Sequence, residues 1–223
     1  MKSERFKPIF GEEYSEPLSW AKKKRLADEY YTRISIKPRV TEDNLDNFLI
    51  ILTGVPGTGK STISKFLYEN FNFNFVATDG IKIFLQSLNL SFVKPDLFHI
   101  QAMIFRKLMN NGVNVTSDSN SGLSTHRLKL KKMAQSLNYK TINIYLSCDL
   151  ETAFNRVIER NQVFDEEKIN EWHRKIYAHD RQTQKPRNAI EINTDKSTDA
   201  IFQELKSIIP KIISSKSTQI EKI

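Results

Sequence analysis

The sequence predicts an α/β domain with a mainly parallel, five-stranded sheet and helices on both faces of that sheet. Three features of the chain lead to this prediction. From Phe48 onward, apolar segments of strand length alternate with segments of helical periodicity. The first strand segment, 48–53, is a continuous apolar run, which is typical of a strand buried on both faces. A glycine-rich segment follows it directly and leads into a helical pattern that starts near Lys60.

The remaining elements follow in alternation along the chain. We expect strands at about 48–53, 73–77, 113–117, 141–146 and 189–192. We expect helices at about 60–70, 80–88, 95–111, 123–137, 150–160 and 198–213. Ahead of the sheet, residues 1–45 differ in composition and predict one basic helix between irregular segments. The domain organisation is therefore an N-terminal extension at 1–45, a main domain at 46–215 and a short tail at 216–223.

Composition limits the classes of protein. With 223 residues, the chain can form one domain that is stable without disulfides or a structural metal. Its single cysteine, Cys148, cannot form an internal disulfide, and no Cys or His cluster has zinc-ligand spacing. We see no signal-peptide pattern and no apolar run of the roughly 18 residues that a membrane span needs. These features favour a cytoplasmic protein without a membrane partner.

The net charge of the chain is +8 and its pI is near 9.4. This balance indicates an anionic ligand, a requirement that ATP alone would satisfy, or else only a solvated basic surface. Trp20, beside the basic run Lys22 to Arg25, is a candidate for stacking and phosphate contacts with a nucleic acid. We expect packing of Trp20 against the domain in preference to this contact. His99 lies in an apolar stretch, and we expect it to be a core histidine.

The segment after the first strand has the residues of a phosphate-binding loop. Glycines let the backbone wrap closely enough for successive N–H groups to point at one phosphate. The following helix turns its positive end to the same anion, Lys60 reaches the β- and γ-phosphates, and the Ser61 hydroxyl is placed to ligate Mg²⁺. ATP is the expected nucleotide, with GTP as the alternative. The residues expected to hold it are Gly54, Val55, Pro56, Gly57, Thr58, Gly59, Lys60, Ser61 and Thr62.

A carboxylate follows at the end of the second predicted strand. Asp79 lies 19 residues after Lys60, a distance that accommodates one helix, one turn and one strand. The chain thereby returns to the edge of the sheet that carries the phosphate-binding loop. A carboxylate at this edge can accept the proton of a hydroxyl that attacks the γ-phosphate. The alternative is that Asp79 caps the next helix.

Four segments together resemble the ordered motifs of small P-loop kinases of the polynucleotide-kinase-like and zeta-toxin-like group. The resemblance spans about 48–213, which leaves the N-terminal extension unexplained, and it implies a P-loop NTPase fold. The matching segments are Gly54 to Ser61, Ala77 to Lys82, Thr116 to Asn120 with His126 and Arg127, and Leu150 to Asn161.

The resemblance also implies roles for individual residues. Asp79 is the general base, Lys82 holds the acceptor or a neighbouring phosphate, and the family usually has arginine where this chain has Lys82. Lysine lacks the bidentate fork of arginine, so a tight contact with a substrate phosphate is less firmly implied. Asp118 and Asn120 lie near Mg²⁺ or the acceptor, and a structural role as a turn or cap is the alternative for Asp118. Arg127 lies on a basic helix that is a candidate to receive an anionic acceptor, and a solvated helix face is the alternative.

Arg156 and Arg160 are one helical turn apart and share a face. In the family, such arginines on the side of the lid grip the transferring phosphoryl group. An ordinary surface pair is the alternative. The polar segment at about 161–187 predicts a lid that closes over the nucleotide. A solvated polar helix is the alternative for that segment.

The leading hypothesis is thus a Mg²⁺-dependent kinase with Lys60, Asp79, Arg156 and Arg160 as its catalytic residues. Its acceptor is the hydroxyl of an anionic molecule, either a polynucleotide 5′-hydroxyl or a small phosphorylated metabolite. Ser61 and Asp118 are the expected metal ligands. Two alternatives stay open: an NTP-dependent switch or nucleic-acid-binding module without kinase activity, and a zeta-toxin-like kinase that acts on a nucleotide sugar.

Overall fold

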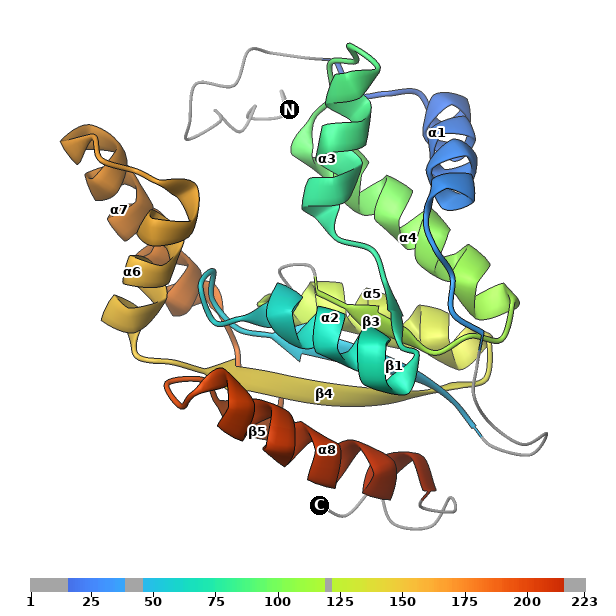
Figure 1. Cartoon of the computed structure of the whole chain (residues 1–223). Helices are drawn as coiled ribbons and strands as arrows, with labels where there is room; N and C mark the ends of the chain where they lie inside the picture. The colour runs from blue at the N-terminus through green and yellow to red at the C-terminus, as the bar shows by residue number, and fades with distance from the viewer. Residues whose placement is uncertain (1–15, 39–45, 119–121, 215–223) are drawn as a thin grey trace, which may run out of the picture. The chain divides into compact units, whose positions relative to one another are not determined.

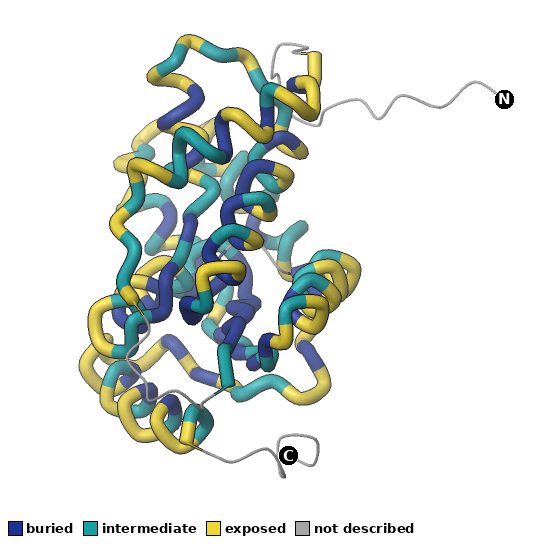
Figure 2. The backbone as a smooth tube through the Cα atoms, turned by 90° about the vertical axis from the view of Figure 1, so that its right-hand side faces the viewer, coloured by how far each residue is buried: buried dark blue, intermediate teal, exposed yellow. Residues whose placement is uncertain are grey.

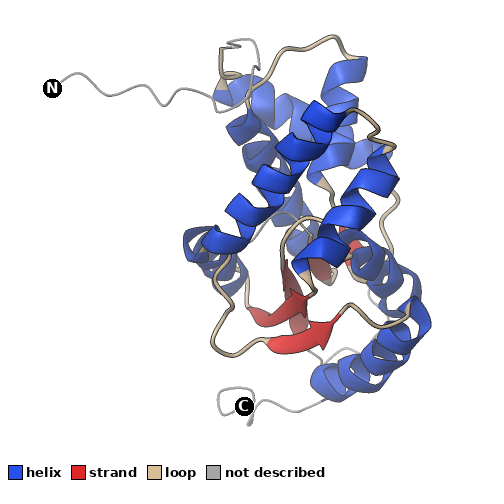
Figure 3. Cartoon of the chain, turned by 90° about the vertical axis from the view of Figure 1, so that its left-hand side faces the viewer, coloured by secondary structure: helices blue, strands red, loops and turns tan. Residues whose placement is uncertain are grey.

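The computed structural model describes residues 16–38, 46–118 and 122–214. Five parallel strands form one sheet in the order β2-β3-β1-β4-β5. Figure 1 labels β1, β3, β4 and β5, and Figure 3 draws the strands in red. The strands are β1 (Asn47–Thr53), β2 (Asn74–Phe75), β3 (Val115–Ser117), β4 (Tyr139–Ser147) and β5 (Ile190–Asn193). This arrangement confirms the predicted fold class.

The helices alternate with the strands, as the sequence predicts. They are α1 (Trp20–Arg33), α2 (Lys60–Phe71), α3 (Thr78–Ser87), α4 (Lys94–Asn110), α5 (Ser124–Ser136), α6 (Leu150–Asn161), α7 (Glu166–Gln182) and α8 (Thr198–Ser214). Most of the polar segment expected as a lid forms α7, and its N-terminus is capped by Asp165, whose side chain accepts from the backbone N–H of Lys168. None of the helices in the described ranges combines the length and the apolar character that a membrane span needs.

Two predicted strands are shorter than expected. Strand β2 has two residues and β3 has three. A buried asparagine lies at the start of each of these strands, and its side chain bonds to a backbone group. The Asn114 side chain accepts from the N–H of Phe48 at 2.9 Å, and the Asn74 side chain accepts from the N–H of Lys37 at 2.8 Å. Side chains thus satisfy backbone groups where the sheet ladder stops.

The described residues divide into two compact units. The helical unit comprises 16–34 and 78–104, and therefore contains α1, α3 and the first part of α4. The sheet unit comprises 35–38, 46–77, 105–118 and 122–214, with all five strands. The sequence did not indicate that α1 groups with residues 78–104.

The sheet unit is organised around alternating side chains of its central strands. Phe48, Ile50 and Leu52 of β1 point to one face, where the apolar sides of α2 and α8 cover them. Leu49 and Ile51 point to the other face and are also fully buried. Figure 2 shows the resulting dark stretches of buried backbone. Burial on both faces explains the continuous apolar run of β1 and fixes where the loop after Thr53 begins.

The helical unit is held together by polar as well as aromatic contacts. The Lys23 ammonium lies 2.8 Å from the Asp96 carboxylate, and both side chains are buried. The second oxygen of Asp96 accepts from the N–H groups of Leu18 and Val93 at 3.1 and 3.0 Å. Tyr30 packs against Phe84 with ring centroids 5.3 Å apart. One buried carboxylate therefore joins the segment before α1, α1 itself and the start of α4.

Two expectations about this unit are wrong. Trp20 does not pack into an interior, because 64% of its surface is exposed. His99 is exposed instead of lying in the core, and its ring meets Trp20 edge to face at 6.2 Å. The apolar stretch around His99 misled the prediction because it belongs to an amphipathic helix whose exposed side includes His99.

Candidate nucleotide-binding site

The phosphate-binding loop lies between the end of β1 and the start of α2. Helix α2 begins at Lys60, after Gly59, which has the left-handed backbone angles φ 82° and ψ 16°. No side chain caps this helix end, and its first turn contains no acidic residue. The helix therefore presents its N-terminal N–H groups and the positive end of its dipole, as anion binding requires.

Two glycines are required by close backbone approach. A Cβ atom on Gly57, whose φ is +90°, would lie 2.1 Å from the carbonyl oxygen of Ala153 in α6. A Cβ on Gly54 would lie 2.6 Å from the Thr58 hydroxyl and 2.9 Å from the carbonyl oxygen of Leu146. The loop is thus pressed against α6 and the end of β4, so only glycine fits at both positions.

Thr58 closes the loop from inside. Its side chain is 1% exposed, and its hydroxyl donates to the carbonyl of Val55 at 2.8 Å. The backbone N–H of Thr58 bonds to the same carbonyl at 3.4 Å. This residue, which the motif assigns to nucleotide contact, therefore also shapes the loop.

Lys60 is folded back onto the loop. Its ammonium donates to the carbonyls of Gly54 and Val55, both at 2.8 Å. Burial lowers the pKa of Lys60 to about 8, the nearby charge of Asp118 acts against this fall, and Arg160 adds to it. The amino group is thus held by neutral carbonyls at the loop, where the phosphates of a nucleotide would supply the missing anionic partner.

Two predicted residues act electrostatically on this ammonium, and a third follows it in α2. Asp118 follows β3 and is 7% exposed, whereas Arg160 lies exposed in the last turn of α6, and both charges act on Lys60. Ser61 is exposed in the first turn of α2. A hydroxyl and a carboxylate are hard oxygen ligands of the kind that Mg²⁺ takes together with nucleotide phosphates. The residues present therefore fit a Mg²⁺–nucleotide complex.

Arg156 has contacts of another kind. Its guanidinium donates to the Thr194 carbonyl at 2.8 Å and to the Cys148 sulfur at 3.5 Å. The predicted pairing of Arg156 with Arg160 in one role is therefore not reflected in their surroundings. Arg156, Cys148 and Thr194 thus form a polar cluster. The sequence did not predict it, because Cys148 and Thr194 follow two different strands, β4 and β5, and belong to no motif.

Asp195 completes that cluster. Its carboxylate accepts from the backbone N–H of Asp149 and from the Cys148 thiol, each at 3.1 Å. Burial and the hydrogen bond with Asp195 raise the pKa of Cys148 to about 11. The thiol therefore stays protonated at neutral pH and has little nucleophilic character.

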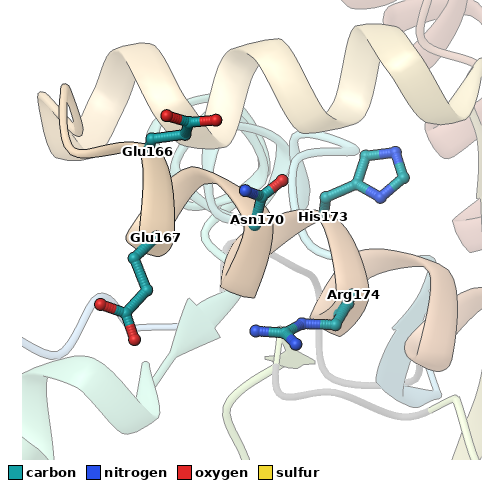
Figure 4. A pocket seen from close by; sticks show the side chains of 5 residues that line it. All are labelled: Glu166, Glu167, Asn170, His173 and Arg174. Atoms are coloured by element: carbon teal, nitrogen blue, oxygen red, sulfur yellow. The ribbon is translucent and has the colours of Figure 1, made fainter.

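The segment expected as a lid, about 161–187, contains α7 and the short connection from α6 in which Phe164 lies. Phe164 is 88% exposed. A pocket of about 770 Å³ lies along the first half of α7. Figure 4 shows the five lining side chains on successive turns of that helix, which are Glu166, Glu167, Asn170, His173 and Arg174. His173 also contacts the rings of Phe154 and Tyr177, so an aromatic cluster joins the two helices.

The predicted acceptor residues are distributed over both units. Asp79 and Lys82 are exposed on α3, with Asp79 in its first turn. Arg127 belongs to the sheet unit, where it is 9% exposed and donates to the Gly122 carbonyl at 2.7 Å. Burial lowers the pKa of Arg127. Asn120 lies outside the described residues.

Comparisons with known proteins agree with this geometry. The family described as "AAA domain" matches residues 50–175. L-seryl-tRNA(Sec) kinase from Methanococcus maripaludis is 26% identical over 188 residues, which cover 78% of this chain and 69% of the relative. A gluconokinase from Sinorhizobium meliloti superposes with a TM-score of 0.54 at 16% identity, covering 76% of this chain and 95% of that one.

A second solved structure is similar over the same extent. The Mycobacterium tuberculosis APS kinase CysC, in complex with AMPPNP and APS, has a TM-score of 0.50 at 17% identity, covering 75% of this chain and 99% of that one. At these identities, the likeness to the two solved structures bears on the fold.

Proposed function

The chain belongs to the AAA-domain family and is a P-loop phosphotransferase with an alcohol group as acceptor, and we propose a finer assignment on this premise. The protein is an ATP- and Mg²⁺-dependent kinase that transfers the γ-phosphoryl group to a hydroxyl of an anionic acceptor. Cytoplasmic location, expected from the sequence, is part of the same proposal.

The observation that carries the proposal is the state of Lys60. Its ammonium is held by two carbonyls, partly desolvated, and close to the charges of Asp118 and Arg160. A lysine in this position gains a strong partner when phosphates enter the loop, so binding energy is directed at the reacting end of the nucleotide. Arg160 adds a second cation that can stabilise the charge on the transferring phosphoryl group.

Mg²⁺ has a supporting set of residues in this proposal. The Ser61 hydroxyl and the Asp118 carboxylate would hold the ion together with the β- and γ-phosphates. When bound, the ion would neutralise charge that develops on the phosphate oxygens.

Asp79 is the proposed general base. In the transfer, the acceptor oxygen bonds to the γ-phosphorus, the bond from that phosphorus to the β–γ bridging oxygen breaks, and the hydroxyl proton passes to the Asp79 carboxylate. Its exposure on the first turn of α3 leaves the carboxylate accessible to an incoming hydroxyl. Lys82, exposed one turn later, would contact an anionic group of the acceptor.

We further propose that the acceptor hydroxyl is carried by an RNA. Two observations favour RNA over a small phosphorylated metabolite. The relative from Methanococcus maripaludis, by its name, acts on a seryl-tRNA, and it aligns with 78% of this chain. The net charge of +8 exceeds what one nucleotide requires and suits a polyanionic acceptor.

The test supplies γ-labelled ATP and Mg²⁺ with two separate acceptor pools. One pool contains RNA with free 5′-hydroxyls and aminoacylated tRNA, and the other contains small metabolites and nucleosides. Label should enter the RNA pool, and Asp79→Asn should lower kcat by about 10²- to 10⁴-fold with unchanged ATP affinity. Lys60→Ala should abolish ATP binding and transfer together.

Asp199→Asn is the matched control, because Asp199 is an exposed aspartate in the first turn of α8. It removes the same charge at a helix N-terminus and should leave transfer intact. Equal losses in the two aspartate variants would contradict the base assignment. Label that enters only the metabolite pool would overturn the RNA assignment and leave the kinase standing.

A further inference from the structure

We infer that the exposed side of α1 is an RNA-binding surface, with Trp20 as its stacking platform and Lys24 and Arg25 as its phosphate contacts. The choice of RNA rests on the function proposed above. The surface itself is defined within the helical unit by residues of α1 and by His99 of α4. The functional site leaves these residues without a role.

Trp20 is the first observation. Tryptophan is on average a highly buried side chain, yet 64% of Trp20 is exposed at the first position of α1. Its ring contacts His99 edge to face at 6.2 Å, with 70° between the two ring planes. An edge contact supports the indole while leaving ring surface open for a base.

The second observation is uncompensated charge beside that ring. Lys24 lies one turn after Trp20, and Arg25 follows it, with both side chains exposed. Within 16–38, 46–118 and 122–214, neither side chain forms an ion pair. Lys22, on the other flank of the helix, is likewise without an ion pair among those residues. A row of cations with no acidic partner is suited to a polyanion.

The third observation is that this helix is firmly anchored. Lys23 points the opposite way, into the buried ion pair with Asp96, while Leu26 and Ala27 are 1% and 0% exposed. The basic run Lys22 to Arg25 therefore contains one buried structural lysine, one half-buried lysine, Lys22, and two exposed cations. Anchoring holds the exposed residues in place, which reduces the conformational entropy lost on binding.

Single-stranded RNA is the ligand that fits this combination. One aromatic ring between cations allows a base to stack while the flanking phosphates meet Lys24 and Arg25. A membrane-binding helix would need an extended apolar face, whereas Trp20 is the one large exposed hydrophobic residue of α1. A protein partner would bury more apolar surface than this helix offers.

The experiment measures RNA binding apart from catalysis. A fluorescein-labelled, single-stranded RNA of about 12 nucleotides is titrated with Lys60→Ala protein, and anisotropy gives Kd at several salt concentrations. The same RNA is added to Trp172→Phe protein. Of the chain's two tryptophans, only Trp20 remains in this variant. Binding should quench the Trp20 fluorescence.

The variants separate stacking from charge. Trp20→Leu should weaken binding about 5- to 100-fold, whereas Trp20→Phe should recover most of the affinity. Lys24→Glu with Arg25→Glu should weaken binding at least about tenfold and reduce the salt slope by about 0.7 for each cation removed. The matched control, Lys206→Glu with Lys211→Glu, changes charge equally on exposed positions of α8 and should leave Kd within about twofold.

Each other outcome has a definite meaning. Equal losses in the α1 and α8 pairs would show only nonspecific attraction and would overturn the surface. RNA phosphorylation that does not respond to Trp20→Leu would also overturn it, while leaving the proposed function intact. Binding through Trp20 without any phosphoryl transfer would support the surface and defeat the proposed function. A labelled acidic peptide that binds through Trp20 more tightly than the RNA would contradict the assignment of RNA.

Discussion

The two units differ in how tightly the fold restricts their residues. In the sheet unit, a Cβ on Gly57 would meet the backbone of Ala153 at 2.1 Å, and backbone cannot turn away. In the helical unit, a Cβ on Gly80 would meet the hydroxyl of Tyr30 at 2.5 Å, the far end of a side chain that can rotate. The nucleotide end is therefore fixed by main-chain geometry, whereas side chains fill the helical unit.

Two lysines repeat the contrast. Lys60 is tied to two carbonyls and its pKa falls to about 8, while Lys82 is exposed on α3. A residue with such constraints can serve one purpose only. An exposed residue on a surface helix has no such constraint and can change without disturbing the fold.

The largest expected effect is that of Gly57→Ala. The added methyl group would overlap the Ala153 carbonyl, and φ of +90° is strained for alanine, so loop and α6 must separate. We expect ATP affinity to fall at least about 100-fold and the free energy of unfolding to fall by about 3 kcal/mol. Isothermal titration and urea denaturation measure the two quantities.

Gly112→Ala provides the control for strain alone. Gly112 also has a positive φ, +69°, but nothing lies within 4 Å of its Cβ position. We expect the free energy of unfolding of Gly112→Ala to fall by about 1 kcal/mol and its ATP affinity to stay unchanged. If Gly57→Ala behaved like Gly112→Ala, the contact with α6 would be unimportant and the contrast between the units would fail.

The sequence predicted the helices and strands of both units, but it did not predict how the helical unit assembles, and the reason is physical. The residue types of the loop from Gly54 to Ser61 indicate its function, because the glycines are needed for the backbone bend and the lysine and serine for contacts with phosphate and its metal ion. The role of Trp20 depends on which helix α1 packs against, and that contact joins residues 76 positions apart, as in the pair Lys23 and His99. No local pattern encodes such a pairing.

The cluster around Arg156 was missed for the same reason. Arg156 and Arg160 look alike in the sequence because they share a helix face. Arg156 differs because its guanidinium donates to the carbonyl of Thr194, which follows β5. The strand order, which places β5 beside β4, therefore gives the two arginines different surroundings, although their spacing predicted one shared role.

The second prediction uses that separation. Arg160→Ala should lower kcat by about 10³-fold, since its charge lies near Lys60 and would otherwise stabilise the transferring phosphoryl group. Its melting temperature should stay close to that of the unaltered protein, because Arg160 is exposed. Arg156→Ala should instead lower stability by about 1 to 2 kcal/mol through the lost bond to Thr194. Steady-state kinetics and thermal denaturation of both variants measure these effects. A large loss of kcat in Arg156→Ala without a loss of stability would contradict the separation and support a catalytic role shared by the two arginines.

The third change has the smallest expected effect on the nucleotide site, because it concerns the helical unit alone. Lys23→Met leaves the Asp96 carboxylate buried without its cation, and we expect a loss of stability of about 3 kcal/mol. Hydrogen exchange should report this loss in α1 and the start of α4, with ATP affinity at the sheet unit unchanged. Lys24→Met, at an exposed position one residue later, should change stability by less than about 0.5 kcal/mol.

The pH dependence of this pair has a definite sign. Burial alone would raise the pKa of Asp96, but the Lys23 ammonium and the N–H groups of Val93 and Leu18 lower it below its ordinary 3.8. The stabilising contribution of Asp96 is therefore present above pH 3.8 and is lost as the pH falls through the folded-state pKa. The difference between Lys23→Met and unaltered protein should be largest near neutral pH and shrink towards pH 3. A difference that stays constant with pH would mean that packing of the lysine stem, and not its charge, holds α1 to α4.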